Sequence, residues 1–224
     1  MAAAGHSQLL GLLRGLISEQ QAGNSTKSVS QIRSGLIPLK LILFSYMLSG
    51  KLVSLSEQQL VDCTKSYGEQ GCSGGYVDKA FQYVEDQGGI DTESSYPYHA
   101  RSEKCHFNKY NVGAKVLNFV DIRRNDENAL KSAIATQGPV AVGIQANLTD
   151  FQFYKHGVYN NHECTERRID HAVLAVGYGV DNGEEYWLVK NSWSTGWGDR
   201  GYIKIARNKH NMCGIASQAS YPVD

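Results

Sequence analysis

The sequence has no excess of either charge and no apolar run long enough to cross a membrane. Lysine plus arginine and aspartate plus glutamate number 22 each, which argues against a nucleic-acid partner. The apolar run from Leu9 to Ile17 contains Arg14 and has no basic lead-in, so it makes a poor secretory signal. The run from Leu36 to Leu48 is shorter than the roughly 20 residues that a bilayer requires. We therefore expect neither a nucleic-acid partner nor a membrane anchor.

Cysteine is absent from the first 62 residues, and no two cysteines form the close C-x-x-C pair of a zinc site. We expect no metal and no cofactor. The odd number of cysteines leaves two interpretations open, reduced thiols in a cytosolic protein or a disulfide framework in a secretory or lysosomal one with one cysteine left over. The five are Cys63, Cys72, Cys105, Cys164 and Cys213.

Sustained hydrophobic periodicity is also missing from the first 49 residues, which we interpret as an unrelated, unstructured leader. The pattern becomes regular at Ser54, which forms an S-x-x-E capping box with Glu57 and predicts a short helix. A second helix is predicted over Val77, Ala80, Phe81 and Val84, whose apolar side chains repeat every three or four residues.

A third helix is predicted from about Asp126 to Gln137, with Asn125 as its cap and Gly138-Pro139 at its end. Strands are predicted where valine, isoleucine and aromatic residues concentrate between turn residues. They are residues 139–146, 171–178, 186–191 and 202–206. Helices followed by antiparallel strands predict an α+β chain in two lobes.

A histidine and an asparagine at the ends of two predicted strands are the candidate catalytic residues. His171 opens one strand, and Asn191-Ser192-Trp193 follows another. A single histidine at such a place is more often structural. A histidine base, however, needs a third group to fix its tautomer, and an asparagine oxygen can accept the ring N–H while a tryptophan shields that bond from water. Cys-His-Asn is one known form of this arrangement.

Several motifs together resemble the papain-like cysteine proteases of the cathepsin L type, over Gly50 to Asp224. They comprise residues 55–63 (LSEQQLVDC), 71–75 (GCSGG), 96–98 (YPY), 170–179 (DHAVLAVGYG), 186–198 (YWLVKNSWSTGWG) and 213–217 (CGIAS). The resemblance implies a papain-like α+β fold with two lobes. Residues 50–118 would be an incomplete helical lobe, and residues 119–224 a β-barrel-like lobe whose C-terminal segment returns to the cleft.

The resemblance also implies site roles. His171 would be the general base and acid, Asn191 its orienting partner, and Trp193 the shield over their hydrogen bond. Gln218 departs from the family pattern, because its amide would make the main specificity pocket more polar, unless the side chain turns to solvent. Residues implied in substrate binding are Gly74, Gly75, Tyr76, Val77, Gly143, Ala172 and Gln218.

Further implications concern disulfides, partners and location. The resemblance pairs Cys63 with Cys105 and Cys164 with Cys213, which leaves Cys72 odd. It implies polypeptide substrates, protein inhibitors of cysteine proteases as partners, and a lysosomal or extracellular location. Asn147-Leu148-Thr149 has the N-x-T pattern of a glycosylation acceptor, which we expect to be exposed.

The nucleophilic cysteine of the family has no counterpart in this sequence. Relatives carry it roughly 130 to 150 residues before the histidine, and residues 21–41 contain no cysteine and no tryptophan. The upstream oxyanion-hole glutamine and the propeptide also lack counterparts. We therefore expect an intact second lobe, a damaged first lobe and no effective proteolysis, although Leu36 to Leu48 could fill part of the gap as a helix.

Two hypotheses follow. The chain is an incomplete product of an endopeptidase gene, or it is a noncatalytic decoy that binds peptides or inhibitors. Sequencing the transcript across the codons for residues 46–51 discriminates between them.

Overall fold

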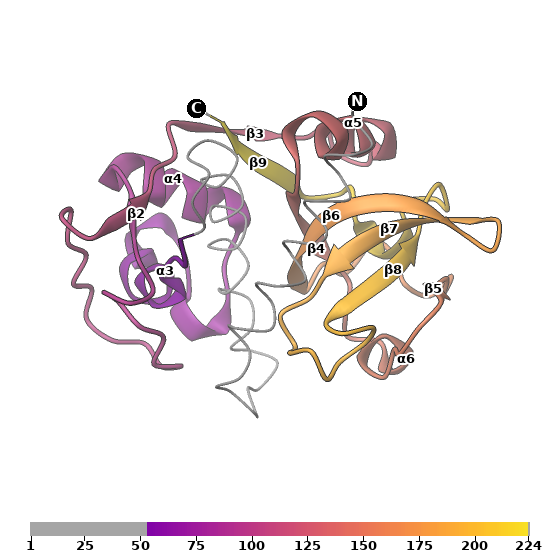
Figure 1. Cartoon of the computed structure of the whole chain (residues 1–224), viewed down its shortest axis with the longest axis horizontal. Coiled ribbons are helices and arrows are strands. Elements are labelled where there is room, and N and C mark those ends of the chain that lie inside the picture. Colours follow the sequence, from indigo (N-terminus) through magenta and orange to yellow (C-terminus); the bar gives the residue numbers. More distant parts are fainter. Residues whose placement is uncertain (1–52, 224) are drawn as a thin grey trace.

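The computed structural model describes residues 53–223, which form an α+β fold with two lobes (Figure 1). Helices α3 (Glu57–Cys63) and α4 (Val77–Gln87) build one lobe, and a seven-stranded sheet builds the other. The expectations for residues 1–49, including the Leu36 to Leu48 helix, lie outside the described residues. Within the described chain, no helix is long and apolar enough to cross a membrane.

The helical lobe begins at a cap two residues later than the sequence predicts. Ser56, rather than Ser54, is the N-cap of α3, and its hydroxyl accepts the Gln59 N–H at 2.9 Å. The same hydroxyl donates to the Tyr96 carbonyl at 2.7 Å, so the cap also holds a distant loop. Short 3-10 turns, η2 (Lys65–Tyr67) and η3 (Gly71–Ser73), connect α3 to α4.

Helix α4 ends at Gly88, whose φ of 76° is the left-handed conformation that glycine adopts without a Cβ penalty. Its predicted apolar face is buried, since Phe81 and Val84 are fully enclosed. Two short paired strands, β1 (Ile90–Asp91) and β2 (Val112–Ala114), complete the lobe.

The large sheet has the strand order β3-β9-β4-β6-β7-β8-β5. Its pairs are antiparallel except for the parallel pair of β5 with β8. The sheet is open, so the expected barrel-like lobe has no closed barrel. The strands are β3 (Asn118–Asp121), β4 (Val140–Ile144), β5 (Val158–Tyr159), β6 (His171–Asp181), β7 (Glu184–Lys190), β8 (Tyr202–Ala206) and β9 (Ala219–Val223).

The four strands predicted for this lobe all form, and β8 has the predicted bounds. Helix α5 (Glu127–Gln137) packs on the sheet through Leu130 and Ile134, but its cap is Asp126 and not Asn125. The Asp126 carboxylate accepts the Ala129 N–H at 2.9 Å. A four-residue helix, α6 (Thr149–Gln152), and a 3-10 turn, η4 (Met212–Gly214), lie in the loops.

A seam joins the lobes where β3 and β9 pair (Figure 1). Phe119 of β3 packs against Phe81 of α4, with ring centroids 5.9 Å apart. The C-terminal strand β9 also pairs with β4 in the middle of the large sheet. The end of the chain is therefore tied to both lobes.

Both implied disulfides are present. Cys63 and Cys105 are joined with a Cα separation of 4.8 Å, and Cys164 and Cys213 with one of 4.4 Å. Cys72 is free.

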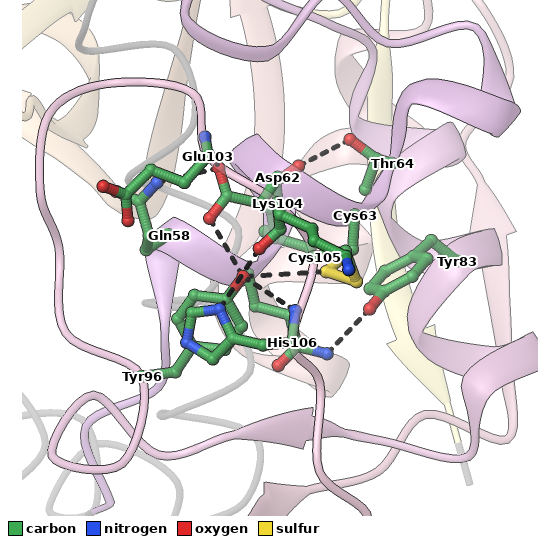
Figure 2. Close-up of a disulfide and its surroundings, with 12 residues drawn as sticks. Gln58, Asp62, Cys63, Thr64, Tyr83, Tyr96, Glu103, Lys104, Cys105 and His106 are labelled. Carbon is green, nitrogen blue, oxygen red and sulfur yellow. Dashed lines mark hydrogen bonds between the residues drawn. A yellow bond between two sulfur atoms is a disulfide. The ribbon is translucent and has the colours of Figure 1, made fainter.

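Figure 2 shows the first disulfide beside a network centred on Asp62. The Asp62 carboxylate accepts the Tyr96 hydroxyl at 2.9 Å and the Glu103 N–H at 2.6 Å. The Tyr96 ring stacks on His106, with centroids 3.6 Å apart. The loop that carries Cys105 is thus held by hydrogen bonds and ring stacking as well as by the disulfide.

Removing the Phe81 ring should destabilise the helical lobe strongly. We expect Phe81→Ala to cost about 3–5 kcal/mol, because the ring is fully buried and its loss leaves a cavity. The matched control is Phe153→Ala, whose side chain is 73% exposed and should cost about 0.5 kcal/mol or less. Urea unfolding followed by circular dichroism at helix wavelengths measures both. Equal losses in the two variants would contradict the assignment of Phe81 to the core.

Candidate active site

His171 and Asn191 form a buried hydrogen-bonded pair. The distance between His171 Nε2 and Asn191 Oδ1 is 2.9 Å, and both side chains are enclosed. Asn191 Oδ1 also accepts the Ser192 N–H at 2.7 Å, which fixes the oxygen, and not the amide nitrogen, toward the ring. An oxygen acceptor requires a proton on Nε2. In the neutral ring, Nδ1 is then the basic nitrogen.

The backbone holds this pair from both sides. His171 opens β6, where it pairs with Ile144 of β4. The preceding residue, Asp170, donates its N–H to the Ile144 carbonyl and accepts the Ala146 N–H at 2.8 Å. Asn191 directly follows β7 and donates its N–H to the Gly201 carbonyl at 2.9 Å. Strand pairing therefore positions both side chains together with hydrogen bonds to residues just outside the strands.

Trp193 lies against the histidine, with ring centroids 5.0 Å apart. Phe151 and Trp197 pack on the other sides of Trp193 in edge-to-face contacts. The Trp193 ring therefore stands beside the His171 ring, and its role as a shield over the His171–Asn191 hydrogen bond remains a prediction. Asn191 Nδ2 and Trp193 Nε1 are buried and have no acceptor among residues 53–223.

A cleft of about 430 Å³ lies between the lobes and is bordered by His171. All seven residues predicted to bind substrate line it: Gly74, Gly75, Tyr76, Val77, Gly143, Ala172 and Gln218. Asn191 and Trp193 are not part of the lining and contact His171 instead. The structure thus brings the predicted residues together, and their role in binding remains a prediction.

Gln218 was expected either to make the main pocket more polar or to turn its side chain to solvent, and it does both. Its side chain is exposed to solvent and at the same time borders the cleft. Its Oε1 atom lies 3.1 Å from where a Cβ on Gly143 would stand. The polar amide is therefore at the pocket wall and remains hydrated.

Some residues that line the cleft were not predicted from sequence patterns. Asp121 and Ser220 line the cleft from the seam strands β3 and β9, joined by a 2.6 Å hydrogen bond from the serine hydroxyl. Asn118 and Asp121 at the ends of β3, and Pro222 within β9, interrupt the runs of β-branched and aromatic residues by which the other strands were predicted. The Glu69 carboxylate lies against Gly75, where it would have to move aside for a Cβ, and it accepts the Tyr76 N–H at 2.8 Å. Burial raises the pKa of Glu69.

The free cysteine, Cys72, is not among the residues that line the cleft, although its neighbour Ser73 is. Cys72 receives a hydrogen bond from the Ser102 hydroxyl at 3.7 Å, on the helical lobe. All five cysteines of the chain lie within the described residues, and none of them lines the cleft.

Lys190 is a buried cation next to Asn191. Burial lowers its pKa to about 8, and the negative charge of Glu57 on the opposite lobe opposes part of that shift. A protonated lysine in this place destabilises the fold because it has lost most of its hydration.

Comparisons with known proteins agree with the fold and with this geometry. Residues 42–223 match the model of the papain family of cysteine proteases. The chain belongs to this family. Its relatives are of the cathepsin L type: it is 59% identical over 176 residues to a cathepsin L-like peptidase of Aedes aegypti and 58% identical over 175 residues to cathepsin L of Sarcophaga peregrina.

Each of these two alignments covers 78% of this chain and 52% of the relative, so the chain spans about half the length of the curated relatives it matches. A solved structure, digestive procathepsin L 3 from the larval midgut of Tenebrio molitor, superposes with a TM-score of 0.81 at 40% identity. That superposition covers 92% of this chain and 68% of the other. The papain-like fold predicted from sequence is confirmed.

Replacing Lys190 by methionine should stabilise the protein. We expect Lys190→Met to raise the free energy of unfolding by about 1–3 kcal/mol near pH 7, because it removes a poorly hydrated charge. The folded pKa of about 8 lies below the ordinary value of 10.5. The unfolded chain therefore binds more protons between these values, and wild-type stability rises with pH across that window. The advantage of Lys190→Met should accordingly shrink between pH 8 and pH 10.5.

Urea unfolding at pH 7, 9 and 10 measures this difference. The control is Lys204→Met, because Lys204 is paired with Asp181 at 2.6 Å and its pKa is raised. This variant should lose up to about 1 kcal/mol, the opposite sign. A Lys190→Met variant that is less stable at pH 7, or whose advantage stays constant with pH, would overturn the assignment.

Proposed function

We propose that the chain carries the histidine side of a cathepsin L-type endopeptidase site and that, as written, it binds polypeptides without cleaving them. One observation carries the proposal. The cleft is lined by His171 and all seven predicted binding residues, and by none of the five cysteines.

The chemistry that this arrangement serves is acyl transfer through a thioester. A cysteine thiolate attacks the scissile carbonyl, an S–C bond forms, the C–N bond breaks, and the leaving amine takes a proton from the imidazolium; water then hydrolyses the thioester. In this chain, His171 Nδ1 would hold and deliver that proton. Asn191 would keep the ring in orientation by accepting the Nε2 proton, and Trp193 would shield that bond.

The missing component is a thiol at the cleft. Four cysteines are consumed in disulfides, and the fifth, Cys72, bonds to Ser102 outside the lining. Without a thiolate no thioester forms, and removal of one member of such a unit costs about as much as removal of all of it. The chain would need a thiol from another source in order to turn over peptide bonds.

The cleft favours an extended peptide with a moderately polar residue in the main pocket. Gly75 lines the cleft without a side chain of its own, and Tyr76, Val77 and Ala172 supply apolar wall. Gln218 adds a hydrated amide at the edge of this pocket. We infer that this pocket accepts moderately polar substrate side chains as well as bulky apolar ones.

A lysosomal or extracellular location fits the two disulfides, which persist in oxidising compartments. The second candidate is a decoy that binds peptides or protein inhibitors of cysteine proteases. It is supported by the same observation, a cleft that all the predicted binding residues line and no cysteine does. The two candidates differ in an assay of peptide cleavage after a polypeptide that carries a thiol has been added to the chain. Only the endopeptidase candidate would then gain activity.

The purified chain alone should show no turnover. We expect no cleavage of fluorogenic peptides at acidic pH in the presence of a thiol reductant, because no cysteine faces His171. A cathepsin L-type relative assayed in parallel provides the positive control. Cleavage that a cysteine-directed epoxide abolishes would contradict the proposal, and Cys72→Ser would then test the only free thiol.

Peptide binding should nevertheless occur and should depend on Gly143. A methyl group there would lie 2.7 Å from Ile169 Cγ2 and 3.1 Å from Gln218 Oε1, so Gly143→Ala narrows the pocket. We expect the dissociation constant of a labelled peptide to rise about tenfold, or about 1.4 kcal/mol. The control, Gly177→Ala, places its methyl group 4.0 Å from Leu188 Cβ and outside the cleft lining. Fluorescence anisotropy measures both, and equal affinities in the two variants would argue against this pocket.

A further inference from the structure

A loop next to the site carries an acceptor pattern that the proposed function does not use. Asn147-Leu148-Thr149 connects β4 to α6, and both Asn147 and Thr149 are exposed. Leu148 has an extended backbone and packs partly against the core. The asparagine and the threonine therefore stand in solvent on either side of an anchored residue.

The Asn147 amide is oriented by a relay of hydrogen bonds. Its Oδ1 accepts Nε2 of Gln145 at 3.0 Å, and Gln145 Oε1 in turn accepts the Thr165 N–H at 2.7 Å. Gln145 is only 7% exposed, so it is a rigid support. The oxygen of Asn147 thus faces the protein. Its Nδ2 makes no hydrogen bond with residues 53–223, which leaves the nitrogen open to substitution.

We propose that Asn147 carries an N-linked oligosaccharide. In the transfer, Asn147 Nδ2 forms a bond to the anomeric carbon of an oligosaccharide, the bond from that carbon to a lipid diphosphate breaks, and Nδ2 gives up one proton. The glycosylated amide keeps its Oδ1, so the hydrogen bond from Gln145 survives the modification. The inference rests on the secretory location included in the proposed function, because the transfer takes place on that route.

The attachment point lies close to the catalytic pair. The adjacent residue, Ala146, donates its N–H to the Asp170 carboxylate, and Asp170 both precedes His171 and lines the cleft. The oligosaccharide would therefore stand beside the histidine end of the cleft.

The test is expression of the full chain behind a cleavable secretion signal in eukaryotic cells. Asn24-Ser25-Thr26 also fits the N-x-S/T pattern, so every protein carries Asn24→Gln. We expect a mass increase that a peptide N-glycosidase reverses. It should vanish in Asn147→Gln and in Thr149→Ala, persist in Thr149→Ser, and be unchanged in the control Asn160→Gln, whose exposed asparagine begins no such pattern.

Two outcomes would overturn the inference. They are a chain whose signal has been cleaved but which shows no mass increase, and an increase that persists in Asn147→Gln. Removal of the sugar should also proceed without denaturant and with both disulfides intact, because Nδ2 is accessible in the folded lobe. Since the signal is supplied, failure here would count against the acceptor site and not against the location or the peptide binding of the proposed function.

Discussion

The pairing of β4, β6 and β7 is the constraint on which the site depends. His171 and Asn191 are 20 residues apart in sequence and meet only because Leu174 of β6 lies opposite Lys190 of β7. The ladder from β4 then fixes the first residue of β6. A one-residue slip in either pairing would turn one member of the pair to the other face of the sheet. The register therefore specifies the geometry of the site as well as the stability of the lobe.

The sequence predicts well those features that depend on neighbours in the chain. The strands rich in valine and isoleucine and the periodic helices α4 and α5 are found where their patterns place them, because each pattern records which face is buried. Caps were predicted less well. Two serines compete at the start of α3, and Ser56 is the cap because its hydroxyl also reaches the distant Tyr96 carbonyl, a contact that no local rule contains.

The remaining parts of the fold and site depend on pairing between distant segments. Strands β3 and β9 are short and gain their partners only when the C-terminus returns between the lobes, so Asp121 and Ser220 could not be assigned to the cleft in advance. The His171 and Asn191 pair could be assigned, because motifs of specific residue types surround it. The hydrogen bond from the Tyr76 N–H to the Glu69 carboxylate could not be predicted, since it joins the backbone to a loop side chain.

The two disulfides have a topological consequence. Cys164 and Cys213 close a covalent ring of chain that contains both His171 and Asn191, and Cys63 and Cys105 close another that contains all of α4. The hairpin tip at Asn182-Gly183 lies inside the first ring and is the kind of loop that proteases cut. A single cut there opens the ring but releases no piece, so the two site residues stay linked through sulfur. The chain can therefore be nicked at this exposed turn and still hold its histidine and asparagine in one covalent molecule.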